Sequence, residues 1–511
     1  MRENLVIVLL IAILVGLALF SPGHDLEVRP QNGDGDDGGT NGTASNNSLI
    51  SCSTSTPFNF SSLNLIETWS VSGDKVIFSS PNSADLNGDN ILDIIIGSGS
   101  EEEQVGAVQA IDGETGVILW KVDTQGEMIG MSTLIYLNDD STPDIVAGGR
   151  NHQLIAVDGA DGTVLWRFNE TDTAQEKWYQ FYTGVDVGDI DGDGIHDILQ
   201  SNGGDPLKAA AEERPVGSLV IISGADGHAI TSAMMPDGRE TYMSPIVVTL
   251  NPQNSPTVIF GSGGETFPGS LWSIPLIEVV NGTLSNATEL IPPTVTKGVI
   301  APPSLADING DGTIDIIAAL FDGRLVAVNG ANNSIMWTIS IGGESYSSPA
   351  IGVLDDDNSP DSFIPFLSGA WPDYTGAEAG AVASNGSVLL ARHSDSSALS
   401  SPLAVDLNGD GRDEIILIEG EAVYPSGSSH SISIIDACTG EESKIWNGTG
   451  FPISTPIITD LDSDGDLEII WAASEFEGGW TVRRGEMSAS TPETISWGGY
   501  LGTNHNGQFT S

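Results

Sequence analysis

The residues best suited to chemistry in this chain are carboxylates, which recur in a nine-residue pattern. The fullest copy runs from Asp189 to Asp197 and reads Asp-Ile-Asp-Gly-Asp-Gly-Ile-His-Asp. Oxygen ligands at positions 1, 3, 5 and 9, a main-chain carbonyl at position 7 and a glycine turn at position 6 suit a hard cation such as Ca²⁺. A short apolar run follows each copy at once. The pattern therefore predicts calcium-binding loops, each leading into a strand.

Eight copies occur, at intervals of 46 to 60 residues, and five have every side-chain ligand. We therefore expect about five Ca²⁺ sites. Their predicted side-chain ligands are Asp85, Asn87, Asp89 and Asp93; Asp189, Asp191, Asp193 and Asp197; Asp307, Asn309, Asp311 and Asp315; Asp406, Asn408, Asp410 and Glu414; and Asp460, Asp462, Asp464 and Glu468. The predicted carbonyl ligands at position 7 belong to Ile91, Ile195, Thr313, Arg412 and Asp466.

Three copies have lost ligands. The copies at 136–144 and 353–361 begin with Tyr136 and Val353 in place of an acid, so whether they bind an ion stays open. The fourth copy, which begins at Thr249, has no carboxylate and is expected to be empty. The apolar run after it is nevertheless intact. The fold therefore needs the repeat at every position, but the ion only at most of them.

The elements that must position these loops can be read from the fifth repeat. Residues 301–339 contain four short apolar runs, separated by the acidic loop and by Gly-containing turns. This order predicts a four-stranded antiparallel meander. One such sheet cannot bury both of its faces, so repeats must stack, and a closed ring protects the ends of the stack. We expect an all-β fold in which residues 58–511 form a single eight-bladed β-propeller, with seven blades as the alternative.

A second signature, Ala-x-Asp followed by Gly and Trp, runs in phase with the loops and places Trp120, Trp166 and Trp337 on equivalent strands. We interpret these tryptophans as wedges between adjacent sheets, with the indole N–H free to reach a loop carbonyl. Ring closure has two candidates. The strand ending at Trp69 could complete the last blade from the N-terminal side, or residues 497–500 could do so from the other end.

The N-terminus differs from the repeats. Residues 1–20 contain an apolar stretch that is long for a signal peptide and short for a membrane span, and we favour a membrane anchor over a cleaved signal. Residues 21–57 are a Gly, Asn, Ser and Asp-rich stretch that predicts a disordered linker. Both readings place the rest of the chain outside the cytoplasm, anchored on the cell surface or secreted, and nine Asn-x-Ser/Thr sequons are compatible with glycosylation. Cys52 and Cys438 could form a disulfide or stay separate thiols.

Composition excludes one class of partner. Seventy Asp and Glu residues against 17 Lys and Arg give a net charge of −53. Nucleic-acid binding requires clustered basic residues, so we expect no nucleic-acid partner. The acid excess is typical of a highly solvated surface.

The two repeated patterns resemble known families over residues 62–500. The acidic loops are similar to the FG-GAP repeats of integrin α-chain propellers, which implies Ca²⁺ between the first two strands of a blade. The Ala-x-Asp-x-x-Thr-Gly-x-x-x-Trp segments resemble the tryptophan-docking repeats of quinoprotein propellers. A quinoprotein resemblance leads one to look for adjacent cysteines, which this chain does not have.

For function we favour a tethered binding or adhesion module that recognises a surface glycan or protein. No catalytic or cofactor-binding residue is predicted, since the seven histidines have neither ligand nor triad spacing. An envelope assembly scaffold is one alternative, and a polysaccharide lyase or quinoprotein-like dehydrogenase is another. Among aromatic residues in inserts, we favour packing for Trp178 to Tyr182 and leave Trp371 and Tyr374 undecided between packing and ligand binding.

Overall fold

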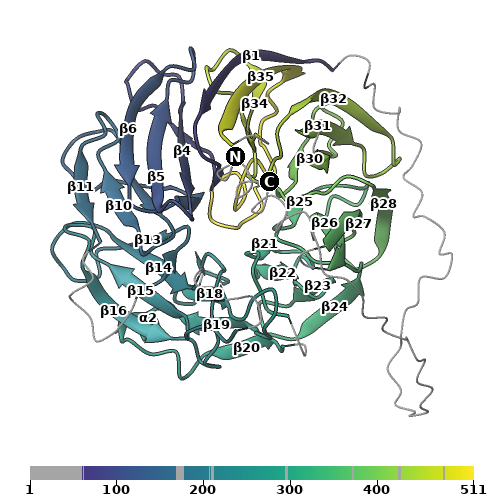
Figure 1. Ribbon diagram of the computed structural model, residues 1–511. Helices are drawn as coiled ribbons and strands as arrows, with labels where there is room; N and C mark the ends of the chain where they lie inside the picture. Colours follow the sequence, from purple (N-terminus) through teal and green to yellow (C-terminus); the bar gives the residue numbers. More distant parts are fainter. Residues whose placement is uncertain are drawn as a thin grey trace, which may run out of the picture.

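Strands rich in β-branched and aliphatic residues account for almost all regular structure in the described part of the chain. The computed structural model describes residue 60 and residues 63–510, except 169–177, 206–207, 209–211, 252, 294–296, 371–372, 424–426 and 476–477. The strands form eight sheets of four main strands each, set around a central axis (Figure 1). The prediction of an eight-bladed propeller is confirmed, and the seven-bladed alternative is wrong.

Each blade is an antiparallel meander whose innermost strand comes first in the repeat. Blades 1 to 4 contain β3 (Asn82–Ala84), β4 (Asp93–Ser100), β5 (Val105–Ile111) and β6 (Ile118–Thr124); β8 (Thr133–Ile135), β9 (Asp144–Gly148), β10 (Leu154–Val157) and β11 (Val164–Arg167); β12 (Gln180–Phe181), β13 (Val185–Gly188), β14 (Asp197–Gly203), β15 (Ser218–Ile222) and β16 (Ala229–Met234); and β17 (Ile246–Val248), β18 (Thr257–Gly261), β19 (Leu271–Pro275) and β20 (Thr288–Ile291).

The second half of the ring repeats the arrangement. Blades 5 to 8 contain β21 (Ser304–Ala306), β22 (Asp315–Ala319), β23 (Arg324–Val328) and β24 (Ile335–Ser340); β25 (Ala350–Gly352), β26 (Asp361–Ala370), β27 (Asp373–Val382) and β28 (Val388–Ser394); β29 (Leu403–Val405), β30 (Glu414–Val423), β31 (Gly427–Ile435) and β32 (Glu442–Thr449); and β33 (Ile457–Thr459), β34 (Asp466–Ser474), β35 (Trp480–Ser490) and β1 (Leu65–Gly73). Outside the blades, β2 (Phe78–Ser80) pairs in parallel with β7 (Ile129–Met131), and the short helix α2 (Leu276–Val280) follows β19.

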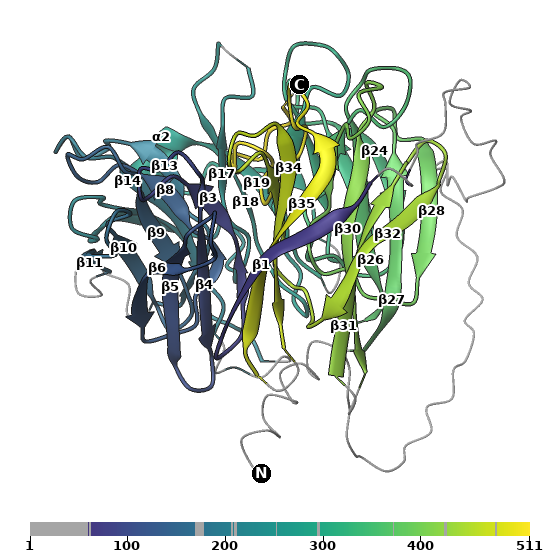
Figure 2. The ribbon, with the colours of Figure 1, turned by 90° about the horizontal axis from the view of Figure 1, so that it is seen from above.

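The ring is closed by strand exchange between the two ends of the described chain. β1 is the outermost strand of blade 8 and pairs antiparallel with β35, from Leu65 opposite Met487 to Gly73 opposite Trp480. Figure 2 shows the purple β1 lying along the yellow β35. The first closure candidate is therefore confirmed. The second is wrong, because residues 497–500 belong to a segment that enters the centre of the ring.

Tryptophans on the outermost strands join neighbouring blades. Trp69 Nε1 donates to the carbonyl of Gly113 at 2.9 Å, Trp120 Nε1 to that of Gly159 at 2.8 Å, and the same bond occurs at Trp166 and Trp337. Each bond runs from one blade to the Asp-Gly turn, or its equivalent, of the next. The interpretation of these residues as wedges is confirmed, and each indole N–H satisfies a carbonyl in the following blade.

The core lies between the sheets. Ile95 of blade 1 and Ile145 of blade 2 belong to one buried cluster, and similar clusters join other neighbouring blades. Trp178 and Phe181 are 4% and 0% exposed in the cluster of blades 2 and 3, so the packing interpretation of that insert is confirmed. Tyr374 is 8% exposed and also packs in a cluster, whereas Trp371 lies outside the described residues.

Several predictions concern residues that lie outside the described part of the chain. These are the anchor at 1–20, the linker at 21–57 and Cys52. Cys438 is in a disulfide bond. No helix in the described ranges has both the length and the apolar character of a membrane span.

Candidate metal loops and axial pocket

The acidic loops fold around their own carboxylates. In the third loop, Asp189 Oδ1 accepts the N–H of Gly192 at 2.7 Å, and Asp189 Oδ2 accepts that of Gly194 at 3.0 Å. Asp193 Oδ1 accepts the N–H of Ile195 at 2.8 Å. Gly192 and Gly194 have φ of +84° and +93°, which a side chain would strain. The sequence thus produces a tight turn that faces its acidic oxygens toward one another.

The ninth residue of the loop has a structural role that the sequence pattern did not reveal. Asp197 is fully buried; its Oδ2 accepts the N–H of Ile190 at 2.7 Å, and its Oδ1 accepts that of Gly224 at 3.1 Å. This carboxylate therefore ties the acidic loop to the turn between the third and fourth strands of the same blade. Asp144 and Asp361 make the equivalent bond to the second residue of their own loops. This explains why the acid at position 9 persists in loops that have lost the one at position 1.

Some of the predicted ligands converge and others do not. One oxygen from each residue lies within 4.8 Å of the others in three trios that follow the repeat: Asp189, Asp191 and Asp197; Asp355, Asp357 and Asp361; and Asp460, Asp462 and Asp464. A further trio joins Asp464 and Asp466 to Glu486 of β35. The loops at 85–93, 307–315 and 406–414 form no such carboxylate trio in the described structure, and each has Asn at position 3. The sixth loop, left open from its sequence, thus has converging carboxylates.

The eighth loop fits a cation best. Asp460 Oδ1 and Asp462 Oδ1 are buried and accept no hydrogen bond among the described residues, and Glu468 Oε1 is buried with only an ion pair to Arg484 Nη2 at 3.3 Å. Burial raises the pKa of Glu468 to about 7, an effect that the Leu461 N–H and Arg484 only partly offset. Buried carboxylate oxygens without donors are costly, and a divalent cation satisfies several of them at once. The donor set is therefore suited to Ca²⁺.

Arginine side chains already reach two of the loops. Arg484 Nη2 lies 2.6 Å from Asp462 Oδ2 and 3.3 Å from Glu468 Oε1. Arg412 Nη2 lies 2.6 Å from Asp410 Oδ2, and its Nη1 lies 2.9 Å from Asp356 Oδ1 in the sixth loop. Arg412 was predicted to supply only a carbonyl ligand, but its guanidinium also links two neighbouring loops. These ion pairs supply positive charge where the acid density is high.

The C-terminal segment, residues 491–510, lies inside the ring. Leu305 N donates to Gly507 O at 2.8 Å, Ala404 and Trp497 exchange two main-chain bonds of 3.0 and 2.9 Å, and Ile458 N donates to Gly498 O at 2.8 Å. The segment therefore pairs with the innermost strands of blades 5, 7 and 8. Its yellow trace occupies the centre of the ring in Figure 1.

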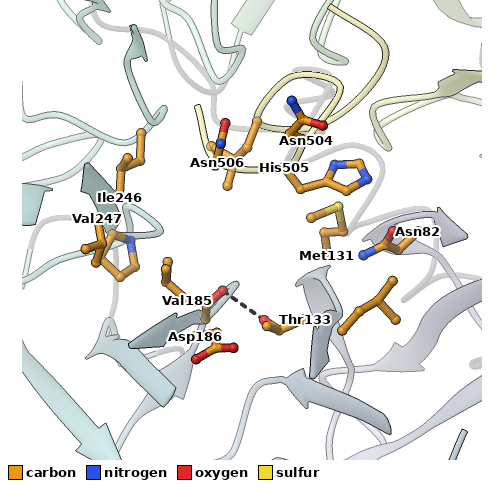
Figure 3. A pocket seen from close by; sticks show the side chains of 14 residues that line it. Asn82, Met131, Thr133, Val185, Asp186, Ile246, Val247, Asn504, His505 and Asn506 are labelled. Atoms are coloured by element: carbon orange, nitrogen blue, oxygen red, sulfur yellow. Dashed lines mark hydrogen bonds between the residues drawn. The ribbon is translucent and has the colours of Figure 1, made fainter. Parts of the chain in front are cut away.

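A cavity of about 320 Å³ remains between this segment and the other side of the ring. Inner strands of blades 1 to 4 line one side of it, and Asn504, His505 and Asn506 line the other (Figure 3). His505 Nδ1 lies 2.9 Å from the carbonyl of Tyr500, so this nitrogen carries the proton and donates to it, which leaves Nε2 as an acceptor. Burial lowers the pKa of His505, which favours this neutral form.

At the end of the inner strands opposite the acidic loops lies a group of ionisable side chains. Tyr242 Oη donates to Glu240 Oε2 at 2.8 Å, and Arg214 Nε lies 3.3 Å from the same oxygen. In the equivalent position of blade 6, Glu344 binds Lys297 Nζ at 2.6 Å and accepts from Tyr374 Oη at 2.7 Å. These residues come from separate repeats, and a Glu-x-Tyr pattern before the innermost strand (240–242 and 344–346) is the signal that could have found them.

Comparison with known proteins supports part of the resemblance seen in the sequence. The family model described as outer membrane protein assembly factor BamB matches residues 96–189, from β4 of blade 1 to the end of β13 in blade 3. No curated protein matches the chain. The match covers the tryptophan-docking segments that end at Trp120 and Trp166, but not the one that ends at Trp337. The FG-GAP resemblance rests on the loop sequences alone.

Solved structures with the same fold include two dehydrogenases and a yeast protein. A europium-containing methanol dehydrogenase aligns with a TM-score of 0.55 at 13% identity, over 87% of each chain. The quinohemoprotein alcohol dehydrogenase of Comamonas testosteroni aligns with a TM-score of 0.52 at 14% identity, over 85% of this chain and 78% of its own. Sqt1 of Saccharomyces cerevisiae aligns with a TM-score of 0.51 at 12% identity, over 84% and 100%. At such identities the likeness establishes the fold alone.

Proposed function

We propose that this chain is a calcium-stabilised, non-catalytic propeller that acts outside the cytoplasm as a binding platform for proteins of the cell envelope. The observation that carries the proposal is the C-terminal segment inside the ring. Trp497 is fully buried there, and the segment is hydrogen-bonded to three blades. The side of the ring's centre next to blades 5, 7 and 8 is thus filled by the chain itself, so side chains of these blades do not converge with those of the other blades on one open site.

Two further observations support the platform. The partial match to an outer membrane assembly factor favours a role in the envelope, and the apolar stretch within residues 1–20 favours attachment there. Of the two aromatic residues considered for ligand binding, Trp371 lies outside the described residues, and Tyr374 is 8% exposed and bound to Glu344, which weakens the support for glycan recognition. A protein partner is therefore favoured over a glycan.

Calcium has a structural part in this proposal. The eighth loop would hold Ca²⁺ through Asp460, Asp462, Asp464 and Glu468, and the third through Asp189, Asp191, Asp193 and Asp197, where the ion neutralises clustered carboxylates. A cation that binds only the folded state raises stability by mass action. The melting temperature of the full chain should therefore rise with Ca²⁺ and fall in excess chelator. If Ca²⁺ and excess chelator left the melting temperature unchanged, the chain would not be stabilised by calcium.

A propeller enzyme is the second candidate, and one observation favours it. Burial raises the pKa of Glu240 to about 7, and its Oε1 has no hydrogen-bond partner among the described residues. Carboxylates perturbed in this way are common in active sites. Purification of the full chain from membranes in Ca²⁺ separates the two functions. A stoichiometric envelope protein that co-purifies supports the platform, whereas a bound organic cofactor and no partner would overturn it.

A further inference from the structure

The innermost strands of all blades present the same main-chain edge to the centre of the ring. In every blade except blade 3, where the register shifts between Asp186 and Gly188, the residue two positions before the acidic loop stands opposite the residue eleven positions after it. Examples are Leu305 opposite Ile316 and Ala404 opposite Ile415. In blades 5 and 7 the N–H and C=O of this residue both bond to the C-terminal segment. The edge is therefore a demonstrated docking surface for an extended chain.

Leu134 and Val247 occupy this position in blades 2 and 4. Leu134 stands opposite Ile145 and Val247 opposite Val258, in the register of Leu305. Their N–H and C=O groups accordingly point to the centre of the ring, and neither residue has a main-chain bond to the C-terminal segment in the described structure. Leu305 and Ala404 are fully buried, whereas Leu134 and Val247 are only half-buried.

These two unfilled edge positions line the axial cavity. Met131, Ile246 and Leu501 supply apolar walls, and Asp186 supplies a carboxylate. Figure 3 shows Val247 and Asp186 on one side of the opening, Asn504 and Asn506 across from them, and Met131 beside His505. An exposed strand edge beside apolar pockets is the arrangement that binds a peptide by strand addition.

Charge narrows the choice of peptide. The chain carries a net charge of −53, and Asp186 at the cavity is exposed, with His196 Nδ1 3.0 Å from its Oδ2. A segment with a basic residue on each side of an apolar one would complement the acidic surroundings of the cavity. An acidic segment would be repelled.

We propose that the axial cavity binds an extended segment of a partner protein, in which an apolar residue flanked by Lys or Arg pairs with the main chain of Leu134 and Val247. This deepens the proposed function, on which it rests, by giving the platform a site and a class of ligand. Residues 497–509 pair with inner strands on one side of the ring. The bound segment would make the corresponding pairing on the other side.

The test uses the full chain in Ca²⁺ and a named probe, the acetylated and amidated pentapeptide Lys-Val-Leu-Val-Lys, with calorimetry to measure its Kd. We expect saturable binding below about 1 mM. Methylation of the central leucine amide removes one donor and should raise Kd at least tenfold. The peptide Asp-Val-Leu-Val-Asp should bind at least tenfold more weakly.

Variants locate the site. Val247→Trp and Asn504→Trp fill the cavity from opposite sides and should each raise Kd at least tenfold, while Ile277→Trp on exposed α2 should leave it unchanged. Two variants are used because one of them could fail to fold. Absence of binding, or binding that neither cavity variant nor methylation weakens, overturns the proposal.

A second measurement distinguishes a partner from the chain itself. A photoreactive residue at position 504 should cross-link to the pentapeptide. A cross-link to residues 1–59 of the same chain would assign the cavity to that segment and overturn the proposal. Because a partner protein can still co-purify when the peptide does not bind, failure here is distinct from failure of the platform function.

Discussion

Arg484 Nη2 lies 2.6 Å from Asp462 Oδ2 in the eighth acidic loop, while Arg484 Nη1 donates to the carbonyl of Gly113 at 3.0 Å in blade 1. The same carbonyl accepts the indole N–H of Trp69. One guanidinium therefore connects a candidate metal loop to the seam at which the ring closes. Its charge and the charge of a bound cation act on the same carboxylates.

Replacement of Arg484 by Met should make stability depend more strongly on Ca²⁺. Glu468 is fully buried, and removal of one partner of a buried ion pair costs about 3–5 kcal/mol. We expect a loss of this order in chelator and a smaller loss in Ca²⁺, because the cation replaces the lost positive charge. Thermal unfolding in both conditions measures the difference. Lys121→Met, at an exposed pair of 3.8 Å, is the control. Equal losses in the two conditions would show that no cation reaches this loop.

Asp191→Asn should remove one ion and leave the rest. Asp191 is one of three converging carboxylates in the third loop, and each loop binds through its own residues. Calorimetric titration of the chelator-treated chain should show a stoichiometry lower by about one, with the other sites unaffected. Asn251→Ala, in the loop without carboxylates, should leave the stoichiometry as it was. A change at Asn251, or none at Asp191, contradicts the ligand assignment.

Gly162→Ala should destabilise the junction of blades 1 and 2. Gly162 has φ of +77°, and an added Cβ would lie 2.9 Å from Trp120 Cβ and Cγ. Positive φ alone costs about 1 kcal/mol in a non-glycine residue. Gly238→Ala isolates that cost, because φ is +70° there and nothing lies within 4 Å. Denaturant unfolding should show the larger loss for Gly162→Ala. Equal losses would mean that the contact with Trp120 is unimportant.

The pH dependence of stability should include a contribution from Glu240. Burial raises its pKa to about 7, although the Tyr242 hydroxyl and Arg214 oppose this shift. The folded chain then binds this proton more tightly than the unfolded chain, so stability falls as pH rises from about 4.5 toward 7. Glu240→Gln should remove about 1–3 kcal/mol of that fall, measured by denaturant unfolding between pH 5 and 8 in constant Ca²⁺.

The control for this measurement is Glu114→Gln, at an exposed turn position. It should reproduce the pH profile of the unmodified chain. If Glu240→Gln also reproduces that profile, the Glu240 carboxyl is ionised throughout the range, and its environment is more polar than the contacts indicate.

Trp497→Ala should weaken the hold of the ring on the C-terminal segment, residues 491–510. The side chain is 0% exposed and packs in the cluster of blades 5 to 7. Loss of a buried tryptophan costs about 3–5 kcal/mol. Hydrogen exchange should show faster exchange at Ala404, which donates to Trp497 O. Undisturbed protection at this amide would show that the segment is held without the tryptophan.

Local repetition made most of the fold predictable. The acidic loop, the apolar run after it and the tryptophan at a fixed position recur in phase, so the number of blades and the role of Trp120 could be inferred from spacing. The strand at Trp69 was one of two closure candidates because Trp69 stands at the same distance before an acidic loop as Trp120 and Trp337. Each of these features is encoded within one repeat.

What could not be predicted depends on contacts between distant repeats. Residues 491–510 do not follow the repeat, so nothing in their order shows that they enter the ring and bond to Leu305 and Ala404. Arg484 reaches the eighth loop from β35, and Arg412 reaches the sixth loop from the seventh. Such pairings are set by the curvature of the whole ring and have no signal in local spacing.

The exchange of strands at the seam has a consequence for biogenesis. Leu65 and Met487 face each other across more than 400 residues of intervening sequence. A polypeptide that is delivered from its N-terminus onward must keep β1 unpaired until the last blade has been delivered, and contacts this distant in sequence form slowly. Until then the edges of β1 and β35 are open to other chains. Folding of this ring should thus be most vulnerable to aggregation at its final step, when a holding chaperone would have the greatest effect.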